Sequence, residues 1–308
     1  MRALMKAWEG FFFSQVDVRQ YAALRITLGS LTVIYLAELF PLSPLHFSQE
    51  GWLGNVQDLD IYNAGYWSLL FLLGSETQTY SFFLIAILFA LGFTLGYKTR
   101  LCGLVTLIAL VSLWNRNPLI LDGDDALLRV MLFYLILSPC GEAFALDATR
   151  KRYPKTGDIW PLQLIRFQMA LIYFVSGWVK LHSPEWRDGT ILEYVLVHPD
   201  YSRWDFSHFF AYPAVLQALN GLAKVILWWE FLFPVLLVWS TTRRLCLFMG
   251  MVFHVGLLVF MNLRWFPWIM LTLYLAFIPD HYFELLCSPL RQRFCRKNFW
   301  GVSGGVKL

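Results

Sequence analysis

Long stretches of apolar residues recur along the chain, and several approach the roughly 20 residues that a helix needs to cross a 30 Å hydrocarbon core. Of the 308 residues, 58% are hydrophobic and only 15% are charged, whereas soluble domains carry about 25% charged residues. The sequence therefore predicts an all-α membrane protein, a polytopic helix bundle. About eight membrane spans are expected, near residues 21–40, 80–97, 101–115, 125–140, 160–182, 222–240, 245–262 and 265–279.

The basic residues alternate between the two sides of the predicted bundle. Cytoplasmic loops carry an excess of lysine and arginine, so this alternation orients the chain. Of the 25 Lys and Arg residues, 16 fall on one side and only four on the other. We therefore predict that both termini are cytoplasmic, with one transmembrane domain at residues 1–285 and a short basic cytoplasmic tail at 286–308.

Two long loops lie on the predicted outer side, from Pro41 to Thr79 and from Leu181 to Gly221. The first includes "YWSLLFLLG", which is too short to cross a bilayer, and the second includes the aromatic segment "WDFSHFFAY". Segments of this kind favour interfacial helices, which lie along the membrane surface. The outer face is therefore expected to be the more elaborate one.

Several function classes lack their motifs in this sequence. It contains no serine-nucleophile elbow, phosphate-binding loop, paired-histidine metal motif or CxxC. Hydrolysis and nucleotide chemistry are therefore not expected, and no metal is predicted. The net charge of +4 comes from basic residues scattered between apolar runs. We therefore predict membrane lipids, and no nucleic acid, as partners.

Nine ionisable side chains within the predicted spans are singled out as candidates. A charge there costs about 2.5–3.5 kcal/mol on insertion scales, so each is a candidate functional residue. Most of them lie in the outer half of the bundle, which predicts a cavity that opens outward. Asp125 and Arg129 stand four residues apart with the acid first, an order that favours a helical ion pair. The nine residues are Arg25, Glu38, Asp125, Arg129, Arg166, Lys180, Lys224, Glu230 and His254.

The predicted span at 160–182 carries a stripe of polar and small residues. At 100° per residue, Arg166, Ala170, Tyr173, Gly177 and Lys180 fall within about 40° of one line along the helix. A stripe with two cations does not suit lipid, so we expect it to face the interior. A glycine in this stripe would let a neighbouring backbone or a ligand approach closely.

Three of these polar groups admit more than one interpretation. Lys180 either extends to the outer headgroups or, because burial favours the neutral amine, acts as a base towards a phenol or hydroquinone. A nearby carboxylate would oppose the base by holding the proton. His254 is either a ligand or proton relay, or a hydrogen-bonded contact between helices. Glu230 precedes Pro234 by four residues, which predicts a kinked helix there.

Five segments together resemble a known family, the HTTM (horizontally transferred transmembrane) domain. This domain is the membrane part of vitamin K-dependent gamma-glutamyl carboxylase and of many bacterial homologues. The resemblance extends over about residues 15 to 285. The segments are "LWNRNPLILDGDDALLR", "LSPCGEAFALD", "IRFQMALIYFVSGWVKLHSPEWRDGT", "WWEFLFP" and "VFHVGLLVFMNLRWFPWIML".

The resemblance implies a specific chemistry. In the carboxylase, a lysine in the segment matching "SGWVKL" is the base that deprotonates vitamin K hydroquinone, and Lys180 stands at that position here. The implied cofactor is therefore a reduced quinone, with Glu230 and His254 as further catalytic candidates. Tyr173, Gly177 and Trp178 are the candidate cofactor-binding residues.

The sequence also departs from the carboxylase. That enzyme has two consecutive lysines in this segment, whereas Val179 precedes Lys180 here. In the carboxylase a histidine follows the segment matching "LFYLILSPC", and Gly141 and Glu142 stand near that place in this chain. The resemblance therefore implies the base more strongly than peptide carboxylation itself.

Three functions remain open from the sequence. The first is an integral enzyme of the cell inner membrane that uses a lipid hydroquinone and Lys180 to modify a peptide or lipid at the extracytoplasmic face. The second is a non-enzymatic membrane factor for maturation or export of a secreted peptide, because bacterial relatives include proteins that mature a secreted sporulation-delaying toxin. The third is a transporter, although the sequence has no inverted repeat.

Overall fold

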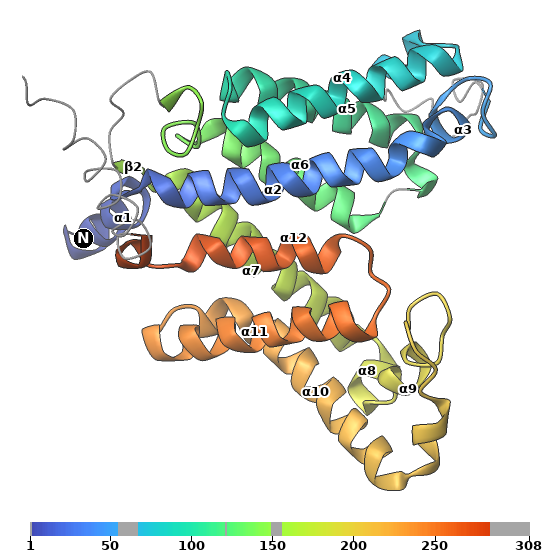
Figure 1. The fold of residues 1–308 in the computed structure, drawn as a ribbon. Coiled ribbons are helices and arrows are strands. Elements are labelled where there is room, and N and C mark those ends of the chain that lie inside the picture. The colour runs from blue at the N-terminus through green and yellow to red at the C-terminus, as the bar shows by residue number, and fades with distance from the viewer. Residues whose placement is uncertain (1, 55–66, 121, 149–155, 284–308) are drawn as a thin grey trace, which may run out of the picture.

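The computed structural model describes residues 2–54, 67–120, 122–148 and 156–283, and this part of the chain is almost entirely helical (Figure 1). The all-α prediction is confirmed. Two three-residue strands, β1 (Gln15–Asp17) and β2 (Thr156–Asp158), pair in antiparallel register. The α-helices are α1 (Arg2–Phe13), α2 (Val18–Leu39), α3 (Ser43–Phe47), α4 (Glu76–Leu95), α5 (Thr99–Arg116), α6 (Gly123–Leu137), α7 (Trp160–His182), α8 (Pro184–Asp188), α9 (Ile191–Val195), α10 (Pro213–Leu236), α11 (Ser240–Phe260) and α12 (Phe266–Leu273).

The loops on the predicted outer side contain short helical pieces. The first loop holds the 3₁₀ turn η4 where the sequence predicted an interfacial helix, with Tyr66 of that segment outside the described residues. The second loop holds α8, α9 and a 3₁₀ turn, so its predicted helical content is present in small units. The 3₁₀ turns are η1 (Phe40–Leu42), η4 (Leu69–Leu72), η5 (Pro118–Ile120), η7 (Ser207–Ala211) and η8 (Tyr274–Phe277).

Each of the eight predicted spans coincides with a helix. Five described segments are long and apolar enough to cross a membrane, which supports a helical membrane bundle. The total of eight crossings and the side of the termini stay predictions, and the predicted tail lies outside the described residues. The five segments are Val18–Phe47, Glu76–Leu95, Trp160–His182, Pro213–Leu236 and Ser240–Phe260.

Helix α10 differs most from its predicted bounds, because the sequence placed residues 213–221 in a loop. The helix begins at Pro213, and Gly221, taken as the end of that loop, lies inside it. A single glycine within a helix costs only about 1 kcal/mol relative to alanine, so it need not end the helix. Pro234 lies in the last turn, two residues before Leu236. The proline therefore lies inside the helix near its end, and the kink expected there stays a prediction.

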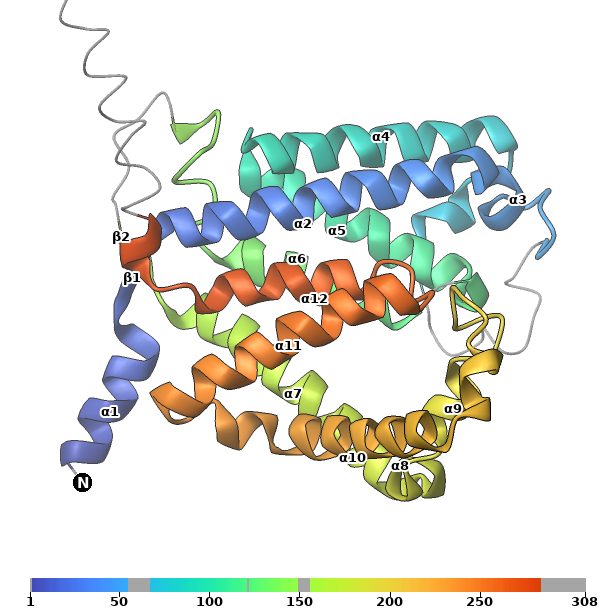
Figure 2. The same ribbon diagram turned by 60° about the horizontal axis from the view of Figure 1, so that its bottom comes forward.

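The long helices form two groups joined by α7. Figure 1 shows α2, α4, α5 and α6 running alongside one another, with α12, α11 and α10 following on one side of that group. Figure 2 shows the same order from a second direction. Helix α7 contacts α6 of the first group and packs extensively along α10. The segment with the predicted polar stripe is therefore the link between the two groups.

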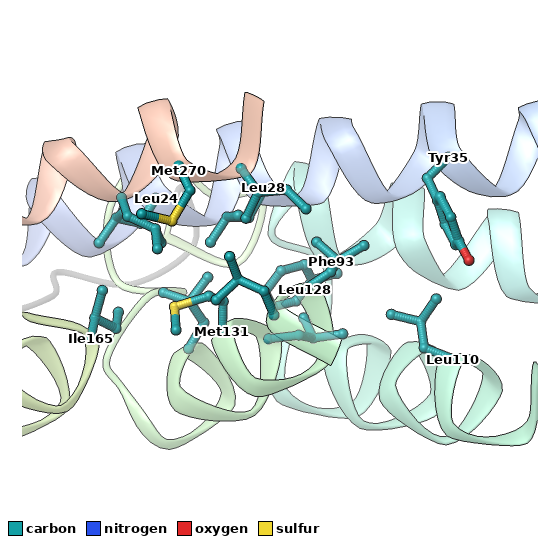
Figure 3. Close-up of a cluster of buried hydrophobic side chains, with 14 of the residues drawn as sticks. Leu24, Leu28, Tyr35, Phe93, Leu110, Leu128, Met131, Ile165 and Met270 are labelled. Carbon is teal, nitrogen blue, oxygen red and sulfur yellow. The ribbon is translucent and has the colours of Figure 1, made fainter. Parts of the chain in front are cut away.

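The first group and α12 share a core of apolar side chains. Figure 3 shows Leu28 of α2, Phe93 of α4 and Met131 of α6 turned towards one another, with Met270 of α12 beside them. All four side chains are buried. In lipid, such contacts stabilise a bundle mainly through close packing, because lipid tails are as apolar as the side chains.

Polar contacts close both ends of the bundle. At the predicted cytoplasmic end, the buried Arg25 guanidinium donates to the carbonyl oxygens of Cys140 and Phe144, each at 2.5 Å. At the opposite end, Trp265 donates through its indole N–H to Glu38 at 2.6 Å, and through its backbone N–H to Asp124 at 3.2 Å. Each end thus joins segments that are distant in the sequence.

The predicted ion pair between Asp125 and Arg129 is not formed as expected. Arg129 donates to the backbone carbonyl of Asp125 at 3.2 Å, and its guanidinium lies 4.2 Å from the ring centre of Trp114. The Asp125 carboxylate instead accepts from the backbone N–H of Asp122 at 2.5 Å, as part of a capping box that begins α6. Capping of an unpaired helix N–H thus takes the place of the ion pair.

Helices α2 and α4 approach each other closely at Gly29. A Cβ atom there would lie 2.4 Å from the Thr94 hydroxyl oxygen and 3.1 Å from the Thr94 Cα. By contrast, a Cβ at Gly221 in α10 would meet nothing within 4 Å. The two glycines therefore differ in packing while both lie within helices.

Substitution of Gly29 tests this packing. Gly29→Ala should lower the free energy of unfolding by about 1–3 kcal/mol, because the added methyl group overpacks the contact. The control Gly221→Ala should leave stability unchanged or raise it by up to about 1 kcal/mol through helix propensity. Unfolding of the detergent-solubilised protein measures both, and equal stability of the two variants would contradict the described packing.

Candidate functional site

A cavity of about 820 Å³ lies between α7, α10 and α11, at the end of the bundle that carries α8, α9 and η7. These three short elements belong to the loop predicted to lie outside. The cavity is therefore at the end of the bundle where the positions of the ionisable residues led us to expect one. Five polar side chains reach it: Tyr173, Ser176, Lys180, Glu230 and His254. Its largely apolar lining includes Ile172, Leu192, Leu196, Phe206, Phe210, Leu219, Ile226, Val252, Phe253, Leu257 and Met270.

Lys180 and Glu230 form an ion pair on the cavity wall. The Lys180 Nζ donates to Glu230 Oε2 at 2.5 Å and to the Ser176 hydroxyl at 2.6 Å. It also lies 4.8 Å from the ring centre of Trp186 in α8, a cation–π distance. The side chains of Lys180 and Glu230 are 16% and 3% exposed. The amine therefore turns towards α10 and α8 within the bundle.

The sequence left open whether a carboxylate lies near the Lys180 amine. Glu230 is that carboxylate. In a buried pair the attraction between the charges offsets their loss of hydration, and removing one partner leaves an uncompensated charge. Ser176 and Trp186 stabilise the ammonium further, since a hydroxyl oxygen accepts its N–H and a ring face attracts its charge. The arrangement holds a proton between Lys180 and Glu230, next to a cavity large enough for a ligand.

Gly177 allows this pair to form. A Cβ atom at Gly177 would lie 2.3 Å from the Phe231 backbone nitrogen and 2.9 Å from the Glu230 carbonyl carbon. Only glycine therefore fits where α7 meets α10, which confirms the predicted close approach of a neighbouring backbone. The contact brings Glu230 to Lys180, which is 50 residues away in the sequence.

A second polar group lines the cavity two helical turns from Lys180. The Tyr173 hydroxyl contacts His254 Nε2 at 2.7 Å and the Tyr274 hydroxyl at 2.6 Å. All three side chains are buried. A Cβ at Gly250 would lie 1.9 Å from the Tyr274 oxygen, so this glycine makes room for the tyrosine. We call Tyr173, His254 and Tyr274 the tyrosine–histidine chain.

This chain bears out the interpretation of His254 as a hydrogen-bonded contact between helices, although a relay role is compatible with the same contact. Sequence reasoning did not find Tyr274, because nothing local marks a residue 101 positions from its partner Tyr173. It also did not single out Ser176, whose position four residues before Lys180 places both on one helix face. Trp186 was equally missed, although it lies just after the predicted span at 160–182, at the start of the second outer loop.

Two predicted residues lie away from the cavity. Trp178 is half-exposed and stacks on Phe174 and Phe231 at the surface of the bundle. One residue advances a helix by about 100°, so the neighbour of an inward Gly177 points to another face. Arg166 donates to the Ala276 carbonyl at 2.7 Å, near the start of α7. The role predicted for Trp178 has no support from its position.

Comparison with known proteins places the chain in a family. Residues 13–282 match the HTTM domain. The chain belongs to the HTTM domain family. It is 22% identical over 311 residues to the sporulation-delaying protein SdpB of Bacillus subtilis (strain 168), and the match covers 92% of this chain and 90% of that protein. No solved structure matches the chain. The family resemblance predicted from the sequence is confirmed, and the chain is a membrane protein of this family.

A double-mutant cycle tests the ion pair. Lys180→Met and Glu230→Gln should each lower the free energy of unfolding, Lys180→Met by about 3–5 kcal/mol, because it leaves a buried carboxylate unpaired. The double variant should recover most of this loss, and the measurement is unfolding of the detergent-solubilised protein. Lys224→Met in α10 is the matched control, since Lys224 is exposed, and it should have little effect. Additive losses of the two site variants would show that the residues do not interact.

Proposed function

We propose that this HTTM-family protein is an enzyme of the cell inner membrane that binds a lipid hydroquinone in the cavity and uses Lys180 as a base. Its product would be a modified peptide or lipid at the extracytoplasmic face, and a secreted peptide is the proposed partner. The observation that carries the proposal is a partly buried amine in contact with a buried carboxylate on the wall of a large, mostly apolar cavity.

The residues present fit a hydroquinone with a hydrocarbon tail. Ligand sites of about 300–1,000 Å³ with mainly apolar walls and a few placed polar groups are typical of small-molecule binding, and this cavity has about 820 Å³. Side chains from η7, α10 and α11 offer apolar contact along its length. Lys180 and Ser176 offer hydrogen bonds to a hydroxyl oxygen. When bound, the hydroquinone would supply reducing equivalents to oxygen.

Glu230 is the acceptor to which Lys180 would pass its proton before acting as a base. Transfer of the ammonium proton to Glu230 gives a neutral amine beside a carboxylic acid, and removes two buried charges whose desolvation costs several kcal/mol each. The free amine then accepts a proton from a ligand hydroxyl, and becomes an ammonium again beside the Trp186 ring. General base catalysis of this kind contributes about 10²–10⁴ in rate.

A second function is favoured by one comparison. The similarity to a sporulation-delaying protein extends over nearly the whole of both chains. We therefore keep as the alternative a non-enzymatic membrane factor that matures or exports a secreted peptide, with the cavity as its binding site. In that case the peptide would contact the apolar lining, and Lys180 would serve only to hold α7 and α10 together.

Lys180→Arg separates the two functions. Arginine keeps the positive charge and the pairing with Glu230 but stays protonated in proteins, so it cannot act as a base. Oxygen uptake by the protein in lipid nanodiscs, supplied with a reduced prenylated naphthoquinone, should fall at least about 100-fold in this variant. Lys224→Arg is the matched control and should retain full uptake. If wild type and Lys180→Arg consume oxygen equally, Lys180 is not the base.

A further inference from the structure

The tyrosine–histidine chain has one more proton than its contacts use. Tyr173 and Tyr274 each carry one hydroxyl hydrogen, and a neutral imidazole carries one N–H. The two contacts, Tyr173 with His254 and Tyr173 with Tyr274, use two of these three hydrogens. His254 Nδ1 is buried and has no hydrogen-bond partner in the described part of the chain. One hydrogen of the chain is therefore left without an acceptor.

Rotation of the hydroxyls, together with the Nε2–H tautomer of His254, can place this hydrogen on Tyr173. If His254 Nε2 and the Tyr274 hydroxyl both donate to the Tyr173 oxygen, the Tyr173 hydroxyl is free to donate to a ligand in the cavity that it lines. If Tyr173 instead donates to His254, its oxygen keeps one lone pair that can accept from a ligand hydroxyl. The same side chain can thus bind a carbonyl oxygen or a hydroxyl.

The spacing along α7 fits a ligand with two opposed oxygens. Tyr173 and Lys180 are seven residues apart, which is about 10 Å along the helix and within about 20° of one face. Both side chains are long, and both lean towards the start of the helix. Two oxygens across a six-membered ring are about 5.5 Å apart, and a hydrogen bond at each end extends this span to about 11 Å.

We infer that Tyr173 binds the second oxygen of a para-dioxygenated aromatic ligand whose first oxygen contacts Lys180. His254 and Tyr274 are positioning residues that hold the Tyr173 hydroxyl and set whether it donates or accepts. The inference rests on the proposed function, because the first oxygen is the hydroxyl that Lys180 deprotonates. It adds that Tyr173 recognises the oxygen at the far end of the ring in both the reduced and the oxidised ligand.

Binding of two probes tests this inference without any turnover. The probes are a prenylated naphthoquinone, with two opposed oxygens, and the matching prenylated naphthol, with one. Quenching of tryptophan fluorescence gives the dissociation constants, since Trp186 and Trp229 line the cavity. Tyr173→Phe should weaken naphthoquinone binding about fivefold, the value of one neutral hydrogen bond, and leave naphthol binding unchanged. Tyr134→Phe is the matched control, because it removes a hydroxyl that bonds Gln168 outside the cavity.

The outcomes separate the two claims. A loss confined to the naphthoquinone supports the inference. An equal loss for both probes in Tyr173→Phe means that Tyr173 acts only through packing. Equal affinity of the wild type for both probes means that the second oxygen is not recognised. Each result overturns the inference and leaves the proposed role of Lys180 as a base in place. Failure of wild type to bind either probe overturns the proposed hydroquinone function and this inference with it.

Discussion

The Lys180–Glu230 ion pair is the contact on which the site depends. It crosses from α7 to α10 at the point where Gly177 lets the two backbones meet. Because α7 also packs against α6, the pair connects the cavity to the core of the first helix group. Two charges in an apolar surrounding stabilise the fold only as a pair. The same requirement keeps a proton between an amine and a carboxylate at the edge of the cavity.

Close helix packing and the candidate site residues lie in different parts of the bundle. Around α2, α4, α5 and α6, close contacts such as Gly29 with Thr94 bring apolar helices together, and polar groups serve mainly to close the ends. On the other side of α7, the helices enclose a cavity, and Tyr173 and Lys180 on one face of α7 anchor the two polar groups that reach it. A closely packed group of helices thus supports a second group that leaves space for a ligand.

Features that depend on a single helix could be predicted from the sequence. Tyr173, Gly177 and Lys180 share a face because they follow the helical period, and the start and end of α7 agree with the prediction. Partners on other helices were not predictable, because the 50 residues from Lys180 to Glu230 and the 81 from Tyr173 to His254 carry no such period. Two expectations failed where another contact overrode a local signal: Gly221 did not end a loop, and the Asp125 carboxylate joined the capping box of Asp122 in place of an ion pair.

The most direct measurement is a cryo-electron microscopy structure of the protein in lipid nanodiscs with a reduced prenylated naphthoquinone, prepared without oxygen. The account predicts an aromatic ring in the cavity between α7, α10 and α11, with one oxygen within hydrogen-bond distance of Lys180 Nζ. A ring bound elsewhere, or a cavity filled only by phospholipid chains beside an intact Lys180–Glu230 contact, would contradict it.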